Sequence, residues 1–384
     1  MPTHNNSRPW FSLLDVLRGP AAILVFAEHW RNLLFIDFPE LVDPGIGLKL
    51  FYLFSGAGRE AVMIFFVLSG CVIAHVTSGM FRQDRWSWPA YLSARLTRLW
   101  VVLLPALLLT AFWDKAGIYL SHGRASIYSG NYGSILIAPV VESLDFMDFV
   151  GNFFFLQKIL VPAYGSNGPL WSISYEFVYY LAFPLIFIAF RQLPKPNLSG
   201  LCSLALAIGL LFGAGWSVCQ GFFIFLMGVF VYFLYRFKPF PVRFSVPGFA
   251  FGVVLTLSII VASRMQLPSG ILSWEVLLGL STAIAIYAGL SARPSASMDR
   301  VTEPLQKASA VSYSMYLFHT PLLVFFASLL FRSNSDRWQP DIMHLSLGAI
   351  VALLVIGYCL IGWYFTERRT KDIRSLLSPF TAAQ

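Results

Sequence analysis

The sequence predicts an all-α membrane protein in which about ten transmembrane helices form one bundle, with both termini in the cytoplasm. Hydrophobic residues make up 57% of the 384 residues and charged residues only 12%, which is too little charge to cover a soluble protein of this length. The apolar residues come in blocks of about 20, the length that crosses a bilayer as a helix. The run from Leu345 to Phe365 does not alternate as a barrel strand would, so helices are favoured over a closed barrel.

Ten apolar segments are long enough to be spans. In chain order they lie at approximately Leu13–Phe35, Ala61–Gly79, Leu99–Trp113, Leu170–Phe190, Leu198–Trp216, Cys219–Tyr235, Ser245–Ala262, Ile271–Leu290, Val311–Phe331 and Leu345–Phe365. With the N-terminus in the cytoplasm, 17 of the 27 lysines and arginines fall on the cytoplasmic side, in agreement with the positive-inside rule. The basic net charge therefore reflects topology, and we expect no nucleic-acid partner.

The chain is expected to be a single membrane domain over residues 1–384, without an internal repeat or a second soluble domain. Its longest connection, residues 114–169, falls on the outer side, and loops of this length are more often functional than idle. Within it, the apolar stretch Phe149–Leu160 is too short to span and predicts a re-entrant or interfacial helix. The four cysteines show no metal-ligand spacing, so no metal site is expected.

Ionisable residues in the first span form a polar stripe. Arg18 and His29 are eleven residues apart, which places them within about 20° of one helix face and about 16 Å apart along the axis. Asp15 lies on the same face. A guanidinium suits a phosphate or a carboxylate, whereas a neutral imidazole can act as a general base or as a nucleophile that accepts an acyl group. The simpler alternative is an Asp15–Arg18 ion pair with His29 near the lipid headgroups.

The start of the fourth span is also rich in polar side chains. Ser172, Glu176 and Tyr179 lie in its first turns. Glu176 is about 9 Å along the axis from the start of the span, which is the depth expected for His29, so we expect Glu176 to support the imidazole. A cluster of capping and interface-belt residues is the alternative; it accounts well for the aromatic residues and poorly for the glutamate.

The ninth span carries a second polar stripe. Ser312, Tyr316 and His319 follow an i, i+4, i+7 spacing, which directs them to one side of a helix. His319 is expected near the middle of the membrane. Tyr316 and His319 are therefore candidates for contact with substrate or for support of the site, and a polar contact between helices explains them equally well.

Two arginines precede the third span. Arg95 and Arg98 are one helical turn apart and share a face. Paired guanidinium groups suit the phosphates of an acyl-CoA that arrives from the cytoplasm. On spacing alone, an ordinary positively charged flank of a span is the simpler interpretation.

These segments, in this order, resemble the acyltransferase 3 family of multi-pass bacterial membrane acyltransferases. The matching stretches are Leu14 to Gly19 with His29, Phe65 to Gly70, Arg95 and Arg98 with Pro105, Trp171 to Glu176 with Tyr179, Ser312 to His319, and Glu367 with Arg368. The similarity covers nearly the whole chain. The sequence departs from the family pattern at Pro20, where a hydrophobic residue is usual, and at the closing Glu367 and Arg368, which lack the usual proline.

The resemblance implies an acyltransferase of the bacterial inner membrane that has ten spans and no permanently bound cofactor. The implied donor is a cytoplasmic acyl-CoA, most often acetyl-CoA, and the implied acceptor is a glycan hydroxyl on the outer side. Membrane lipids and the polysaccharide assembly machinery are the other partners it suggests. The resemblance assigns Arg18, Arg95 and Arg98 to the CoA side and His29 to the acyl chemistry, with Glu176 in support.

Two other functions remain open at this stage. A transporter or flippase for a glycan or lipid-linked sugar would use the same polar residues to line a pathway. Such proteins often show paired halves with broken helices, and the sequence has no such symmetry. A membrane O-acyltransferase of a different fold, acting on a protein or a lipid, would keep the reaction and change the acceptor.

Overall fold

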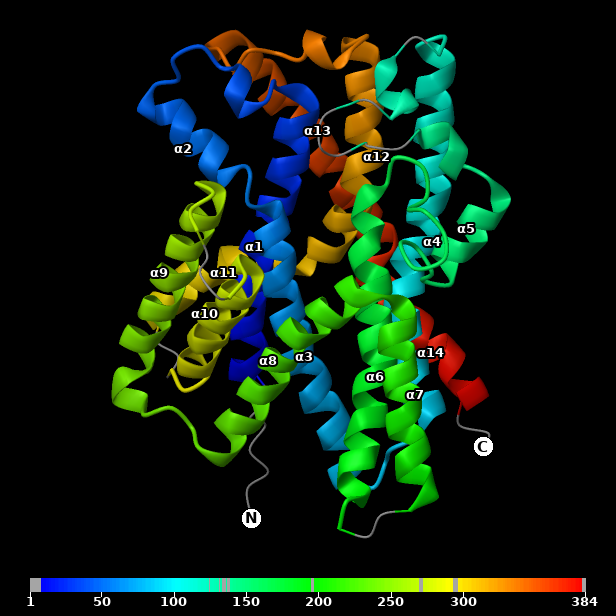
Figure 1. Cartoon of the computed structure of the whole chain (residues 1–384), viewed down its shortest axis with the longest axis vertical. Helices are drawn as coiled ribbons and strands as arrows, with labels where there is room; N and C mark the ends of the chain where they lie inside the picture. The colour runs from blue at the N-terminus through cyan, green and yellow to red at the C-terminus, as the bar shows by residue number, and fades with distance from the viewer. Residues whose placement is uncertain are drawn as a thin grey trace. The chain divides into compact units, whose positions relative to one another are not determined.

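The computed structural model describes residues 8–123, 125–130, 132, 136, 139–194, 197–268, 272–292 and 296–381. Within these ranges the chain is helical and has no β-strand, which confirms the predicted all-α class (Figure 1). The predicted domain limits at residues 1 and 384, and residues 124, 131, 133–135 and 137–138 of the predicted outer loop, lie outside the described residues.

Among the described residues, seven helical segments are long and apolar enough to cross a membrane. They are Ile46–Arg82, Trp88–Leu120, Gly168–Gln192, Trp216–Phe237, Val242–Arg264, Ser312–Leu330 and Ile342–Ser375. Two shorter apolar helices, α7 (Leu198–Ala214) and α10 (Trp274–Gly289), lie where the fifth and eighth spans were predicted. The first predicted span lies on α1 (Arg8–Leu34), which contains Pro20. The total of ten membrane crossings stays a prediction.

Several helices differ in extent from the prediction. The third predicted span lies on α4 (Trp88–Leu120), which extends beyond it at both ends and includes Arg95, Arg98 and Asp114. Charged residues end an apolar pattern, but they do not end a helix whose backbone hydrogen bonds continue. The outer connection therefore begins after Leu120 rather than at Asp114. This connection contains α5 (Phe146–Phe153), which packs on α4. The predicted short helix Phe149–Leu160 is thus helical only as far as Phe153, and the chain forms turns from there to Leu160.

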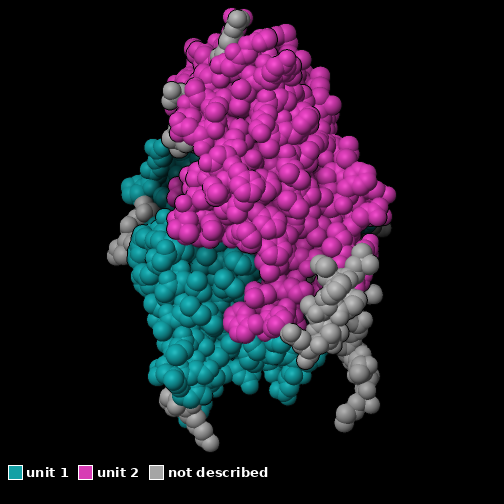
Figure 2. Space-filling view, turned by 90° about the vertical axis from the view of Figure 1, so that its right-hand side faces the viewer, with its two compact units in different colours: residues 1–18, 60–87, 172–307 teal, residues 19–59, 88–171, 308–384 magenta. Residues whose placement is uncertain are grey.

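The remaining helices complete the order of elements. They are α2 (Ile46–Phe54), which the sequence did not predict, and α3 (Gly58–Arg82), α6 (Trp171–Gln192), α8 (Trp216–Phe237), α9 (Ser245–Arg264), α11 (Ala296–Ala310), α12 (Ser312–Leu330), α13 (Ile342–Phe365) and α14 (Thr370–Thr381). Contacts between Cα atoms divide the chain into two compact units, coloured separately in Figure 2: residues 1–18, 60–87 and 172–307 form unit 1, and residues 19–59, 88–171 and 308–384 form unit 2.

The core of unit 1 depends on a close approach of α3 and α8. A Cβ atom on Gly70 would lie 2.0 Å from the carbonyl oxygen of Phe225, and one on Gly228 would lie 1.9 Å from that of Val67. The thiol of Cys71 donates to the carbonyl of Gly228 at 3.1 Å. Small residues at such positions let helix backbones approach closely. Close packing of this kind is usual in membranes, because apolar side chains gain little free energy when they move from lipid into a helix interface. Both glycines are therefore required by the packing.

The core of unit 2 is built around α12. Of its 19 residues 14 are buried, and it packs against α4 and α13. Hydrogen bonds join its first turn to both neighbours. Toward the end of α13, the carboxylate of Glu367 accepts from the backbone N–H and the hydroxyl of Ser314 at 3.0 and 2.8 Å. Toward α4, the Tyr313 hydroxyl donates to the Leu99 carbonyl at 3.3 Å. These contacts bring together the ends of α4, α12 and α13 that are predicted to be cytoplasmic.

Candidate active site

Two histidines from distant parts of the sequence form a hydrogen-bonded pair in unit 2. His29 lies on α1, His319 lies on α12, and the His29 Nδ1 atom is 2.7 Å from the His319 Nε2 atom. The two ring planes differ by only 21° and the ring centroids are 5.0 Å apart, which fits a bond in the plane of both rings. His319 is completely buried, whereas His29 keeps part of its surface exposed. The two predicted candidates are therefore one chemical unit.

The position of each ring proton follows from the partners of His319. Its Nδ1 atom lies 2.7 Å from the carbonyl oxygen of Met315, and because a carbonyl only accepts, Nδ1 must carry the proton. In the neutral ring Nε2 is then an acceptor, so His29 donates to it through Nδ1–H. The remaining His29 nitrogen, Nε2, has a lone pair.

This arrangement gives the pair a chemical capacity. His29 Nε2 can take a proton from a hydroxyl, and His319 stabilises the positive charge that results by accepting from the other nitrogen. Thr320 Oγ1, 3.1 Å from His319 Nε2, adds a second polar contact to the acceptor nitrogen. The ring of Phe26 lies 5.9 Å from that of His319 and makes one wall of the pair apolar. The geometry is that of a general base oriented by a second residue.

A break in the hydrogen bonding of α12 lies close to His319. Pro321 has no N–H, so the carbonyl of Leu317 lacks the donor that an α-helix would supply four residues later. The buried side-chain amide of Asn167 replaces it, donating to the Leu317 carbonyl at 3.0 Å and to the Thr110 hydroxyl at 3.1 Å. The connection before α6 thus holds α12 within one turn of the histidine pair.

The same connection is anchored to α4 and α12 by further buried contacts. The carboxylate of Asp114 accepts from the backbone N–H and the hydroxyl of Ser166 at 2.8 and 2.6 Å. The Tyr316 hydroxyl donates to the Pro169 carbonyl at 2.9 Å. Tyr316, predicted as a substrate or support residue, is thus in contact with the chain that leads into α6, while its possible contact with substrate stays a prediction.

Three predicted site residues on α6 belong to unit 1. Glu176 accepts hydrogen bonds from the Ser69 hydroxyl at 2.9 Å and from the Tyr180 hydroxyl. The Tyr179 hydroxyl donates to the Val218 carbonyl at 2.9 Å, which ties α6 to α8. Ser172 is buried. The predicted support of His29 by Glu176 stays a prediction.

The remaining pair of the first predicted stripe lies on the unit 1 part of α1. The guanidinium of Arg18 bonds the carboxylate of Asp15 at 3.0 Å. The ion pair that the simpler interpretation required is therefore present. The predicted contact of Arg18 with the donor stays a prediction.

The paired arginines of α4 lie among other basic residues of unit 2. Arg95 and Arg98 are half-buried. The turn Glu367–Arg369 and α14 both pack on α4. Arg368 and Arg369 stack on Tyr364, with guanidinium carbons 4.9 and 5.6 Å from the ring centre. Basic residues after a last span are expected from topology alone, so the sequence did not single out Arg369.

The described part of the chain combines long apolar helices with a hydrogen-bonded pair of histidines, and comparison with known proteins gives its class. A family model described as an acyltransferase domain matches residues 11–361. The chain therefore belongs to the acyltransferase 3 family.

One relative is the acyltransferase MdmB of Streptomyces mycarofaciens, which is 28% identical over 191 residues. That alignment covers 48% of this chain and 41% of the relative, so the two chains match over less than half of each. No solved structure matches the chain.

Proposed function

We propose that this acyltransferase moves an acetyl group from cytoplasmic acetyl-CoA to a hydroxyl of a cell-surface or exported glycan, and that it does so in the inner membrane of a bacterium. The observation that carries the proposal is the bond between His29 and His319, whose tautomers are fixed by the Met315 carbonyl. A base prepared in this way suits an acceptor that must lose a proton as it reacts, as a sugar hydroxyl does.

The proposed step uses only groups of the two substrates and the histidine pair. The acceptor hydroxyl gives its proton to His29 Nε2 while its oxygen attacks the thioester carbonyl. The carbon–sulfur bond then breaks, and the leaving CoA thiolate takes the proton from His29. No bound cofactor enters the balance. A general base of this kind typically contributes about 10²- to 10⁴-fold to the rate.

Turnover of the thioester tests the reaction itself. The purified protein in lipid vesicles, supplied with radiolabelled acetyl-CoA and a mixture of bacterial surface glycans, is expected to release free CoA and to place the label on the glycan fraction. Mild alkali should remove that label, because an ester of a sugar hydroxyl is base-labile. If neither acetyl-CoA nor longer acyl-CoA thioesters are consumed in the presence of glycans, the proposed donor is wrong.

In this proposal the basic residues of α4, Arg95 and Arg98, bind the phosphates of the donor. Replacing both Arg95 and Arg98 with glutamine should raise the KM for acetyl-CoA about tenfold or more, because each lost charge-assisted bond to a phosphate is worth more than a neutral one. The value of kcat should change far less, since these side chains do not touch the reacting carbonyl. Initial rates over a range of acetyl-CoA concentrations measure both constants.

Arg85→Gln is the matched control, because Arg85 is an exposed arginine of the loop before α4 and should leave the KM unchanged. An equal rise of KM in the control would show that general surface charge is responsible. A loss of kcat with a normal KM in the double variant would exclude the assignment of Arg95 and Arg98 to donor binding.

A further inference from the structure

The C-terminal turn of α1, which follows His29, has all of its carbonyl groups satisfied. The last four carbonyls of a helix have no partner within it. In α1 each of them accepts one bond: Arg31 from the Phe35 N–H at 2.8 Å, Asn32 from the Arg337 guanidinium at 2.9 Å, Leu33 from the Tyr132 hydroxyl at 3.1 Å, and Leu34 from the Trp338 N–H at 2.9 Å. Three of the four donors come from other parts of unit 2.

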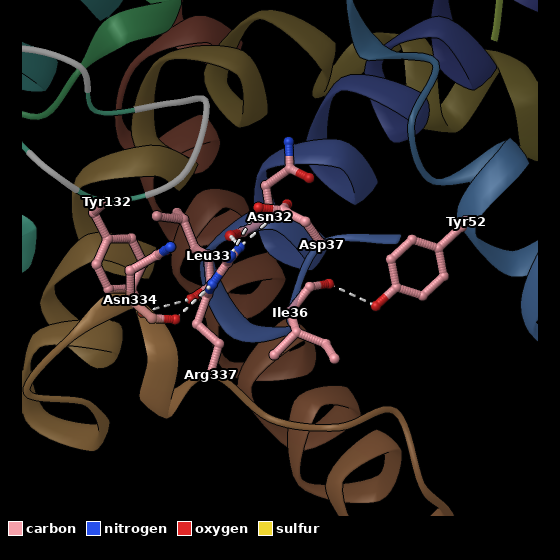
Figure 3. A network of polar contacts seen from close by, with 8 residues as sticks. All are labelled: Asn32, Leu33, Ile36, Asp37, Tyr52, Tyr132, Asn334 and Arg337. Carbon is pink, nitrogen blue, oxygen red and sulfur yellow. Dashed lines mark hydrogen bonds and ion pairs between the residues drawn. The ribbon is translucent and has the colours of Figure 1, made fainter. Parts of the chain in front are cut away.

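Arg337 is the centre of this arrangement (Figure 3). Its side chain has no exposed surface and makes two bonds to the carboxylate of Asp37, at 2.8 and 3.3 Å. Its Nε atom donates to the Asn334 carbonyl at 3.1 Å, and its guanidinium lies 5.8 Å from the centre of the Tyr132 ring. A buried guanidinium is tolerated only when its charge and its donors are matched; here Asp37 pairs the charge, and the guanidinium makes four hydrogen bonds.

The other donors reinforce the same turn. Burial raises the pKa of the Tyr132 phenol, so the hydroxyl keeps the proton that it donates to Leu33. The backbone of Trp338 pairs with that of Phe35, and its carbonyl accepts from the Ile36 N–H at 3.1 Å. Just beyond the helix, the Tyr52 hydroxyl donates to the Ile36 carbonyl at 2.7 Å. The chain is therefore held on several sides directly after α1.

We propose that Arg337 is a positioning residue for acyl transfer, which holds the last turn of α1 so that His29 stays in bonding distance of His319. The inference rests on the proposed function. Arg337 and Tyr132 bond the carbonyls of Asn32 and Leu33. His29 lies three residues before Asn32 and four before Leu33, so all three residues belong to one helical turn. A helix end without such partners frays, and fraying would lengthen the 2.7 Å contact between His29 and His319.

The substitution Arg337→Gln tests this role. We expect kcat per folded protein to fall between about 10- and 100-fold, because small misplacements of a catalytic group have effects of this size. The KM for acetyl-CoA should stay within twofold. Arg337→Lys keeps the charge and loses the forked geometry, so it should fall between the wild type and the glutamine variant. Arg332→Gln, an exposed arginine five residues earlier in the chain, should behave as the wild type.

A double-mutant cycle separates positioning from general stability. If Arg337 acts through the histidine pair, Arg337→Gln should have a much smaller effect on kcat in a His319→Leu background, where the bond to His29 is absent, than in the wild type. Equal effects in both backgrounds, or an unchanged kcat, would overturn the proposal.

A second variant covers the case in which Arg337→Gln does not fold. Asp37→Asn removes the ion pair and keeps the bond between Arg337 and Asn32, so kcat should fall by a smaller factor while the KM for acetyl-CoA stays constant. If the wild-type protein itself does not turn over acetyl-CoA, the proposed function is wrong, and the role of Arg337 in positioning is not what has failed.

Discussion

Replacing His29 with alanine should lower the rate of acetyl transfer by at least about 10²-fold while the protein still accumulates in the membrane. The alanine removes the only atom of the pair that is placed to take a proton from an incoming hydroxyl, His29 Nε2. The packing changes little, because part of the His29 surface is exposed. The rate is measured as CoA release and as label on glycan, per amount of folded protein.

A histidine outside the site provides the control for this experiment. His122 is exposed and has a positive φ of 52°, a backbone conformation that asparagine tolerates well. His122→Asn should therefore retain full activity and a normal amount of protein. Near-normal transfer by His29→Ala would mean that the catalytic base is another residue, and the tautomer argument for the pair would lose its chemical meaning.

The fold could be predicted from the sequence largely because lipid imposes one strong rule. Each apolar block of sufficient length must be a helix, and α13 lies almost where the run Leu345–Phe365 indicated. The errors occurred where this rule does not act. The ends of α4 were placed at charged residues, although Asp114 is buried and satisfied by Ser166. The helix α2 was missed because its nine residues are fewer than a span requires.

The candidate site could be predicted only residue by residue. His29 and His319 were each selected because an ionisable side chain inside an apolar run is unusual. Their contact joins positions 290 residues apart, and it depends on how α1 packs against α12, which no local pattern encodes. Arg337 has no signal in the sequence beyond its charge. Its burial follows from a set of backbone carbonyls and a carboxylate that meet only in the folded unit.

The second large effect is expected at His319, which acts on the reaction through His29. His319→Leu should lower kcat about 10²-fold with little change in the KM for acetyl-CoA, because His29 loses the acceptor that fixes its tautomer and stabilises its charged form. His319→Gln should recover at least about a tenth of the wild-type kcat, since a primary amide offers an acceptor oxygen toward His29 and a donor toward the Met315 carbonyl. Steady-state kinetics on both variants, with folded protein quantified by size-exclusion chromatography, measure the difference.

The two substitutions differ in polarity and hardly in size, so their comparison isolates the hydrogen bonds. His319 is completely buried, and a role in packing alone would make leucine the better replacement, because an unsatisfied amide in this position is more costly than an apolar side chain. Higher activity with glutamine than with leucine therefore supports orientation of His29 through the 2.7 Å bond. The reverse order, or equal loss in both variants, would show that the Met315–His319–His29 chain does not control the base.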